Sequence, residues 1–414
     1  MSEPILALPL PQLDSKFQPG VTDPVWPATA PANVDRKIYE ADYAGQLARQ
    51  RYLHIVTANV SVSAVGEMSD VLHELSWFAH HQEVRDPEKV RKADKALKRP
   101  YDRPIENPRV TVTVGYGATL FTNRDGDDRF GWASFKPTWL KIIPSFPGDD
   151  RAFSPRASAS DLIILLASDD AYVNEYLLGL LYYGIVHKGI KVIAVERGYA
   201  RPDSREPGGF EDGSSNPRGG APNSKMNHFV YVAQGDDEPE WCVDGTYLAY
   251  RKIQRRLAEF FQLSPEDQQK LMGAYKNSGD LFPKAPPESH KCKVNPRREA
   301  PDLFGINDDD RQILRRPYFY DDGLDATRQE LRGVHHLSFM RNLGMQYEWR
   351  VQMWEMNSQF PGKNCGADLM YSAKGGASNV GGGYYFVPGL LEHDLRSPLG
   401  TAHSKEGRDS RVRH

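Results

Sequence analysis

Alternating apolar and polar residues predict a sheet in the first half of the chain. Residues 52–60 (YLHIVTANV) and 109–116 (RVTVTVGY) alternate, and residues 161–168 (DLIILLAS) form a short apolar run. Alternation is typical of a strand with one buried face, and a short unbroken apolar run favours a strand that is buried on both faces. Residues 190–199 (IKVIAVERGY) predict a further strand.

Apolar residues at helical spacing lie between these strands. Residues 65–81 (VGEMSDVLHELSWFAHH) and 174–189 (NEYLLGLLYYGIVHKG) have this spacing, and the second stretch ends at Gly189. A glycine after the last periodic residue is a common end of a helix. The first half therefore gives two β-α-β units, which indicates a ferredoxin-like α+β arrangement.

The second half repeats the first in kind. Residues 228–233 predict a strand, 245–263 a strand then a helix, 335–342 a strand and 344–357 a helix. Residues 264–330 are polar and have little regular pattern, and long segments of this kind are usually functional or disordered. We therefore expect an α+β protein with two ferredoxin-like halves.

Composition shifts divide the chain into five expected parts. The termini and the middle are rich in Pro, Gly, Ser and charged residues, which favours loops and extended segments over packed elements. The expected parts are an extended arm at 1–40, a ferredoxin-like half at 41–205, a linker at 206–227, a second half at 228–395 and a flexible tail at 396–414. Disorder or a docking peptide would explain the tail.

Charge and cysteine content limit the function classes. The formal net charge is −3, whereas a nucleic-acid binder usually carries a basic excess. Cys242, Cys292 and Cys365 form neither a disulfide framework nor a CxxC pair, which fits a reducing compartment. The N-terminus lacks the features of a secretory signal, and no apolar run is long enough to span a bilayer. We expect a cytoplasmic protein that binds neither nucleic acid nor membrane.

Four short motifs follow one another in the chain. They are GFEDGSSNP (209–217), SHKCKVNPR (289–297), ILRRPYFY (313–320) and HHLSF (335–339). Singly, each has an ordinary explanation, such as a turn, a surface histidine or an ion-paired arginine. Together and in this order, they resemble the DyP-type (dye-decolorizing) haem peroxidase family over roughly residues 50–390. The chain has no GxSxG or HExxH motif of a hydrolase.

The resemblance implies one haem b per chain in a dimeric α+β barrel-like protein. His290 matches the histidine that holds the haem iron, and Asp368 is the expected acceptor for its other ring nitrogen. Asp212 and Arg315 match the pair that acts on hydrogen peroxide. The carboxylate would move the proton, and the arginine would stabilise developing negative charge while a ferryl intermediate forms.

The resemblance also assigns the surroundings of the haem. Leu337 and Phe339 match apolar residues that roof the peroxide side. Arg297 is the expected partner of a haem propionate, with Arg316 and Arg341 as alternatives. An unperturbed aspartate titrates near ~4 rather than near ~6.5 like histidine, so we expect the best turnover of bulky dyes in acid.

Bulky donors need an electron path to the surface, because a narrow pocket excludes them. Tyr320 stands where some family members have a tyrosine that carries a radical, and Trp241, Trp349 and Trp354 are further candidates. Most aromatic residues, however, are packing residues. Pro317 departs from the family pattern, which usually has a small residue here, and a fixed φ would reshape the loop after Arg315.

The resemblance therefore implies a peroxidase that uses hydrogen peroxide to oxidise organic donors, such as dyes and phenolics, in one-electron steps. It also implies a homo-oligomer and an encapsulating shell protein as a partner. Four alternatives stay open: oxidation of Mn(II) or lignin, release of iron from haem, a haem-free structural relative, against which His290 argues, and a haem carrier or sensor with little turnover. The last of these would not need Asp212 and Arg315.

Overall fold

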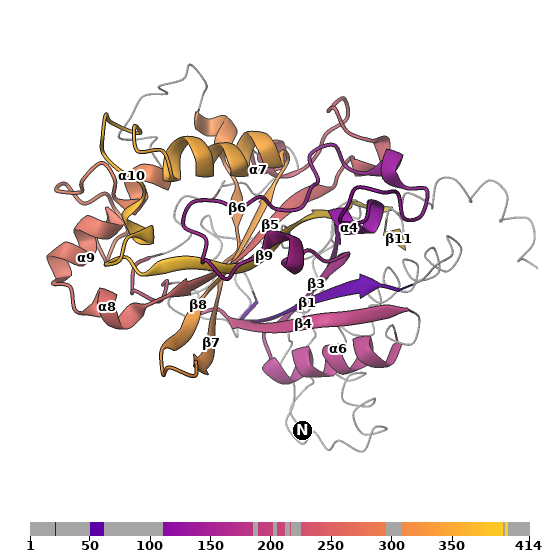
Figure 1. Ribbon diagram of the computed structural model, residues 1–414, viewed down its shortest axis with the longest axis horizontal. Coiled ribbons are helices and arrows are strands. Elements are labelled where there is room, and N and C mark those ends of the chain that lie inside the picture. Colours follow the sequence, from indigo (N-terminus) through magenta and orange to yellow (C-terminus); the bar gives the residue numbers. More distant parts are fainter. Residues whose placement is uncertain are drawn as a thin grey trace, which may run out of the picture.

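An antiparallel sheet forms the centre of the computed structural model (Figure 1). The structure describes residue 21 and residues 50–61, 111–184, 189–201, 205–211, 216, 225–294, 308–391 and 394–395. The strands of the main sheet are β1 (Tyr52–Val60), β2 (Thr111–Gly117), β3 (Leu162–Ser168), β4 (Ile190–Tyr199), β5 (Thr246–Arg255), β6 (Leu314–Arg315), β7 (Tyr318–Leu324), β8 (Glu330–Met340) and β9 (Ala377–Val387). A separate small ladder joins β10 (Leu390–Leu391) and β11 (Asp394–Leu395).

The strand order closes into a ring. The order is β5-β9-β2-β3-β1-β4-β7-β8-β6, and β5 also pairs with β8. The first half contributes β4-β1-β3-β2 and the second half β9-β5-β8-β7, which is the same order of fourth, first, third and second strand. This order is the one expected of ferredoxin-like units, and the predicted α+β class is confirmed.

Two apolar cores lie on the two faces of the ring. Ile55 and Leu165 belong to a cluster that also draws side chains from β5, β6, β7, β8 and β9, so this cluster fills the inside of the ring. Val56 and Ile164 are the next residues along the same strands, and they belong to a cluster on the outer face. Alternate residues of a strand point to opposite faces, so β1 and β3 supply both cores.

Short helices cover the outer face of the ring. They are α4 (Ala118–Phe121), α5 (Pro155–Ser158), α6 (Ala171–Gly184), α7 (Lys225–Val230), α8 (Leu257–Phe261), α9 (Pro265–Met272) and α10 (His290–Val294). Among the described residues there are also the π-helical turns η7 (Leu343–Glu348) and η8 (Val351–Glu355) and the 3-10 turns η2 (Ala133–Phe135), η4 (Glu240–Cys242), η6 (Asp308–Arg311) and η9 (Leu369–Tyr371). Helix α6 packs against β1 and β3, and Figure 1 shows α8, α9 and α10 gathered at the other end of the molecule.

The structure corrects two expectations. Residues 228–233 were expected to form a strand, but α7 runs through Val230, because a short apolar run fits a buried helix as well as a strand. Residues 264–330 hold α9, α10, β6 and β7 rather than one long loop. The expected helix at 65–81 lies outside the described residues. No described helix is both long and apolar enough to cross a membrane. The division into five parts stays a prediction.

Candidate functional site

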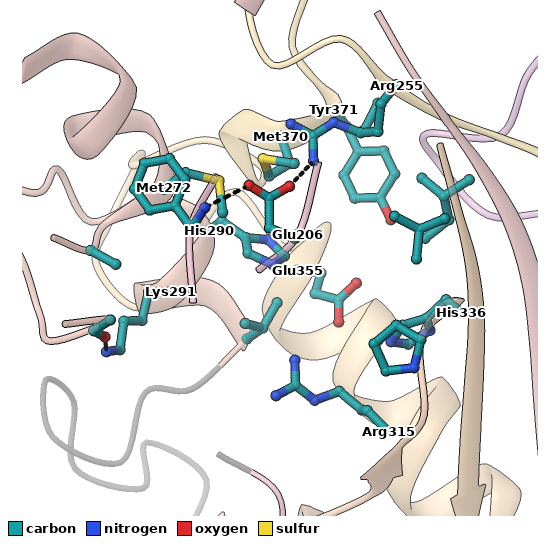
Figure 2. Close-up of a pocket in the computed structure, with 18 of the residues that line it drawn as sticks. Glu206, Arg255, Met272, His290, Lys291, Arg315, His336, Glu355, Met370 and Tyr371 are labelled. Atoms are coloured by element: carbon teal, nitrogen blue, oxygen red, sulfur yellow. Dashed lines mark hydrogen bonds and ion pairs between the residues drawn. The ribbon is translucent and has the colours of Figure 1, made fainter. Parts of the chain in front are cut away.

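A cavity lies between the outer face of the second half of the sheet and the short helices that cover it (Figure 2). It holds about 220 Å³ of space for the centres of water-sized molecules. His290 from α10 and Glu355 from η8 line one side. Strands β5, β6 and β8 line the other side with Ile253, Arg315 and His336, among others.

His290 is held by a buried carboxylate. Its Nδ1 lies 2.6 Å from Oδ2 of Asp368, whose side chain is fully buried. The other carboxylate oxygen of Asp368 accepts the backbone N–H of Met370 at 2.8 Å, which caps η9. A carboxylate only accepts, so Nδ1 of His290 carries the proton and Nε2 keeps its lone pair. About a third of the His290 side chain is accessible, and it lines the cavity.

The charges around His290 favour this arrangement. Burial lowers the pKa of His290, but the carboxylate of Asp368 outweighs burial, so the pKa is raised above its ordinary value. Burial also raises the pKa of Glu355, which lines the same side of the cavity. The backbone N–H of Asp368 donates to the carbonyl of Glu355 at 2.8 Å, so η8 and η9 are tied together beside the histidine.

The residues of β8 that line the cavity are not the ones expected from the sequence. Val334 and His336 line the cavity, and they lie on one face of the strand. Leu337 and Phe339 are buried in the core inside the ring and do not line the cavity. The expected apolar roof is therefore not part of this cavity, because the alternation of the strand turns these two side chains to the opposite face.

Arg315 lies next to His336 on this wall. Arg315 pairs directly with Ser338 in the β6–β8 ladder, so His336 is its diagonal neighbour. Diagonal neighbours have their Cα atoms about 7–8 Å apart, which long side chains can bridge. Ser338 Oγ lies 3.3 Å from Nδ1 of His336. Figure 2 shows the Arg315 and His336 side chains on the same side of the pocket.

The first motif of the sequence reaches this wall through Asn216. Asn216 Nδ2 donates to the carbonyl of Arg315 at 2.9 Å, and its Oδ1 accepts the Arg315 N–H at 3.1 Å. Glu211, at the other end of the motif, lines the cavity. Asp212 lies between them, outside the described residues. Pro317 also lines the cavity, two residues after Arg315.

Arg255 is a basic residue of the cavity that the sequence patterns did not identify. It lies at the end of β5, and its side chain is about 5% exposed. Its Nη1 donates to Glu206 at 3.2 Å, whereas Nε and Nη2 have no hydrogen-bond partner among the described residues. A buried guanidinium with unsatisfied N–H groups costs free energy unless an anion accepts them.

The alternatives for a propionate partner lie elsewhere. Arg316 is buried and donates to Gln50 Oε1 at 3.2 Å, and Arg341 donates to Asp236 Oδ2 at 2.7 Å. Neither residue lines the cavity. Arg297 lies outside the described residues.

The aromatic candidates for electron transfer also lie outside the cavity lining. Tyr320 is buried, and its ring packs on His335 at 4.7 Å between centroids. Trp241 belongs to the outer core, and Trp349 meets Trp354 edge to face at 5.2 Å.

The residues that line the cavity can be tested for their fit to a haem, whose porphyrin supplies most of the ligands of its iron. The described residues contain no group of three or more His, Cys, Asp or Glu that could hold a metal ion by themselves. A haem needs only one or two protein ligands, and a neutral imidazole is a common one. His290 offers that ligand on one wall, and the unsatisfied N–H groups of Arg255 offer a place for an anionic propionate. The described residues therefore fit a haem.

Comparison with known sequences identifies the second half of the chain. Residues 203–392 match the model for "Dyp-type peroxidase, C-terminal". A deferrochelatase of Yersinia pseudotuberculosis is 26% identical over 329 residues, which cover 71% of this chain and 68% of the relative. A deferrochelatase of Shigella sonnei is 30% identical over 181 residues, which cover 41% of this chain and 40% of the relative.

Solved structures extend the similarity to most of the chain. DtpA from Streptomyces lividans superposes with a TM-score of 0.67 at 20% identity, covering 85% of this chain and 93% of its own. A DyP-type peroxidase from Streptomyces coelicolor gives 0.66 at 21% identity, covering 92% and 94%. Identities this low show the fold alone. Taken together, residues 203–392 match the Dyp-type peroxidase C-terminal family, and the fold of most of the chain is similar to that of solved DyP-type peroxidases.

Proposed function

We propose that the chain binds one haem b in this cavity and uses hydrogen peroxide to oxidise organic donors, such as dyes and phenolics, by single electrons. One observation carries the proposal. His290, whose Nδ1 is hydrogen-bonded to Asp368, lines one side of the cavity, and Arg315 and His336 line the opposite side. A bound haem would supply the iron at which peroxide is reduced.

His290 would bind the iron through Nε2. The hydrogen bond from Nδ1 to Asp368 fixes the ring and its tautomer, and it increases the electron density that the imidazole offers to a metal. Because Asp368 is tied to the backbone of η9, the histidine cannot turn away without breaking that contact as well.

Arg315 would stabilise negative charge on the opposite side. A guanidinium stays protonated at any working pH, and here its backbone is fixed by two hydrogen bonds to Asn216. Peroxide must lose a proton from one oxygen and gain one on the other before its O–O bond breaks. Asp212 is the proposed shuttle for this proton, and His336 is a second group on the same wall that can accept and return one.

Basic residues would hold the haem propionates. Arg255 has two buried groups that still require an acceptor. Arg297 stays the proposal from sequence, and the two arginines would serve different propionates or share one.

The name of the curated relatives favours a second candidate function. A deferrochelatase removes iron from haem, and such relatives match up to 71% of this chain. Both functions need haem in the same cavity, but iron release needs protons delivered to the porphyrin nitrogens rather than to peroxide. Iron release would yield a fluorescent metal-free porphyrin without added peroxide, which separates it from peroxidase turnover. A carrier or sensor would show neither product.

Steady-state oxidation of a dye tests the proposal. Arg315→Leu should lower the rate of reaction with peroxide, because the cavity loses its fixed positive charge. Removing one such transition-state contact typically costs about 10²–10³ in rate. Arg151→Leu, which changes an exposed arginine, is the matched control. An unchanged rate in Arg315→Leu would contradict the proposed role.

Several narrower expectations remain proposals. They are the homo-oligomer, the encapsulating shell protein, the cytoplasmic location and the oxidation of Mn(II) or lignin. The acid optimum expected from Asp212 is another.

A further inference from the structure

A tyrosine and a histidine share a hydrogen bond inside the ring of strands. The hydroxyl of Tyr250 lies 3.1 Å from Nδ1 of His335. Tyr250 is on β5 and His335 on the neighbouring β8. Their exposed fractions are 4% and 0%, so water does not compete for this bond.

The second nitrogen of His335 settles the direction of the bond. Nε2 lies 3.2 Å from the carbonyl oxygen of Arg197 on β4. A carbonyl only accepts, so Nε2 carries the ring proton and Nδ1 has a free lone pair. The phenol of Tyr250 is therefore the donor and Nδ1 of His335 the acceptor.

His335 is neutral at any ordinary working pH. Burial and, after it, the positive charge of Lys252 lower the pKa of His335 to about 4. Two carboxylates face the same charge: Lys252 Nζ lies 2.6 Å from Glu196 and 2.7 Å from Asp322. The negative charges of these two carboxylates offset much of the lysine charge. They therefore reduce the electrostatic repulsion between Lys252 and a proton transferred to His335.

The pair lies directly behind the wall of the cavity. His336, the next residue of β8, lines the cavity, while His335 points to the other face of the strand. On β5, Ile253 lines the cavity and pairs with Val334, three strand positions from the pairing of Tyr250 with Leu337. Only the thickness of the sheet separates the pair from the cavity.

We propose that Tyr250 and His335 form a redox site through which the oxidised haem takes an electron from the protein. This inference rests on the proposed function. Tyr250 gives one electron to the haem site, and its phenolic proton moves along the hydrogen bond to Nδ1 of His335. The products are a neutral tyrosyl radical and an imidazolium. An organic donor then returns one electron to Tyr250, and the proton moves back.

The hydrogen bond is what makes this step accessible. A phenol that has lost an electron is a strong acid, and in a buried site its proton needs an acceptor within reach. Among the other buried tyrosines, Tyr116 is fully buried, and its hydroxyl has no hydrogen-bond partner among the described residues. Tyr320 packs on the far side of His335 at 4.7 Å, on the strand that continues to exposed residues 321–324. It extends the route toward the surface.

Electron paramagnetic resonance after rapid freezing tests the proposal. Haem-loaded protein is mixed with one equivalent of peroxide, and the tyrosyl radical signal is recorded. We expect the signal in the unchanged protein and in Tyr116→Phe, and its loss in Tyr250→Phe. His335→Gln, which keeps an acceptor but a much weaker base, should reduce the signal. An unchanged radical signal in Tyr250→Phe would overturn the inference.

Nuclear magnetic resonance of the haem-free protein gives an independent readout. With ¹⁵N-labelled histidine, His335 should show a protonated Nε2 and a hydrogen-bonded, unprotonated Nδ1, and the Nδ1 shift should change in Tyr250→Phe. A protonated Nδ1 would overturn the inference without touching the proposed function. Protein that binds haem and consumes peroxide but forms no radical at Tyr250 would do the same. Failure to bind haem would overturn both.

Discussion

Acid should destabilise the folded chain through one buried imidazole, His335. Its side chain is 0% exposed, and burial followed by the charge of Lys252 lowers its pKa to about 4. In the unfolded chain the same group titrates near ~6.5. As the pH falls below ~6.5, the unfolded chain binds a proton that the folded chain does not. The free energy of unfolding therefore falls with the pH, and the loss is complete near the folded pKa of about 4.

The difference between these two pKa values sets the size of the effect. Each pKa unit is worth about 1.4 kcal/mol, so protonation of His335 removes about 3 kcal/mol of stability between neutral pH and pH ~4. A domain is typically stable by about 5–15 kcal/mol, so this loss is a substantial part of the total.

Urea unfolding of the unchanged protein and of His335→Gln across this pH range measures the effect. Glutamine can still donate to the carbonyl of Arg197 and accept from Tyr250, but it does not titrate. As the pH falls, the free energy of unfolding of His335→Gln should increase by about 3 kcal/mol relative to that of the unchanged protein. Burial also lowers the pKa of His54, but His54 is present in both proteins and cancels. A difference that stays constant with pH would refute the reasoning.

Three further predictions concern other parts of the structure. Asp149→Asn should lower the free energy of unfolding by about 3–5 kcal/mol, because Asp149 is the ion-pair partner of the buried Arg251; a loss below about 1 kcal/mol in urea unfolding would contradict this. Gly117→Ala should lower it by about 1–3 kcal/mol, since a Cβ there would lie 2.0 Å from the carbonyl oxygen of Ser160, and an unchanged thermal midpoint would count against it. Asp368→Asn should weaken haem binding about 10–100-fold in a spectroscopic titration, because His290 loses a charged acceptor, whereas unchanged affinity would show that the contact is not needed.

The strands were predictable from sequence, but the face of β8 was not. The alternation of residues correctly predicts a strand here. In the HHLSF motif, Leu337 and Phe339 point to one face of this strand, and His336 and Ser338 point to the other. In an open sheet the apolar set would face the core and the other set would face water. Here the ring closes, so the inner face holds Leu337 and Phe339, and the outer face holds a cavity rather than solvent. Local pattern cannot tell these two environments apart, and only the strand pairing decides.

The part of the site around His290 was predictable from the sequence, because the family pattern includes this histidine and its carboxylate partner. His290 and Asp368 are 78 positions apart, and the family pattern named both although only the fold brings them into contact. Arg255 was missed because it lies in a run of basic residues (RKIQRR) that reads as a solvated strand end. Its burial depends on Glu206, Phe260 and the helices packed over β5, which no local window contains.

Haem binding through His290 can be measured by the visible spectrum of the purified protein during a haem titration. We expect one haem per chain and a Soret band typical of histidine-bound iron, with this band lost or strongly shifted in His290→Ala. The exposed His228→Ala, a matched control, should titrate like the unchanged protein. If the unchanged protein takes up no haem, or if His290→Ala gives the same spectrum and affinity, the account is contradicted.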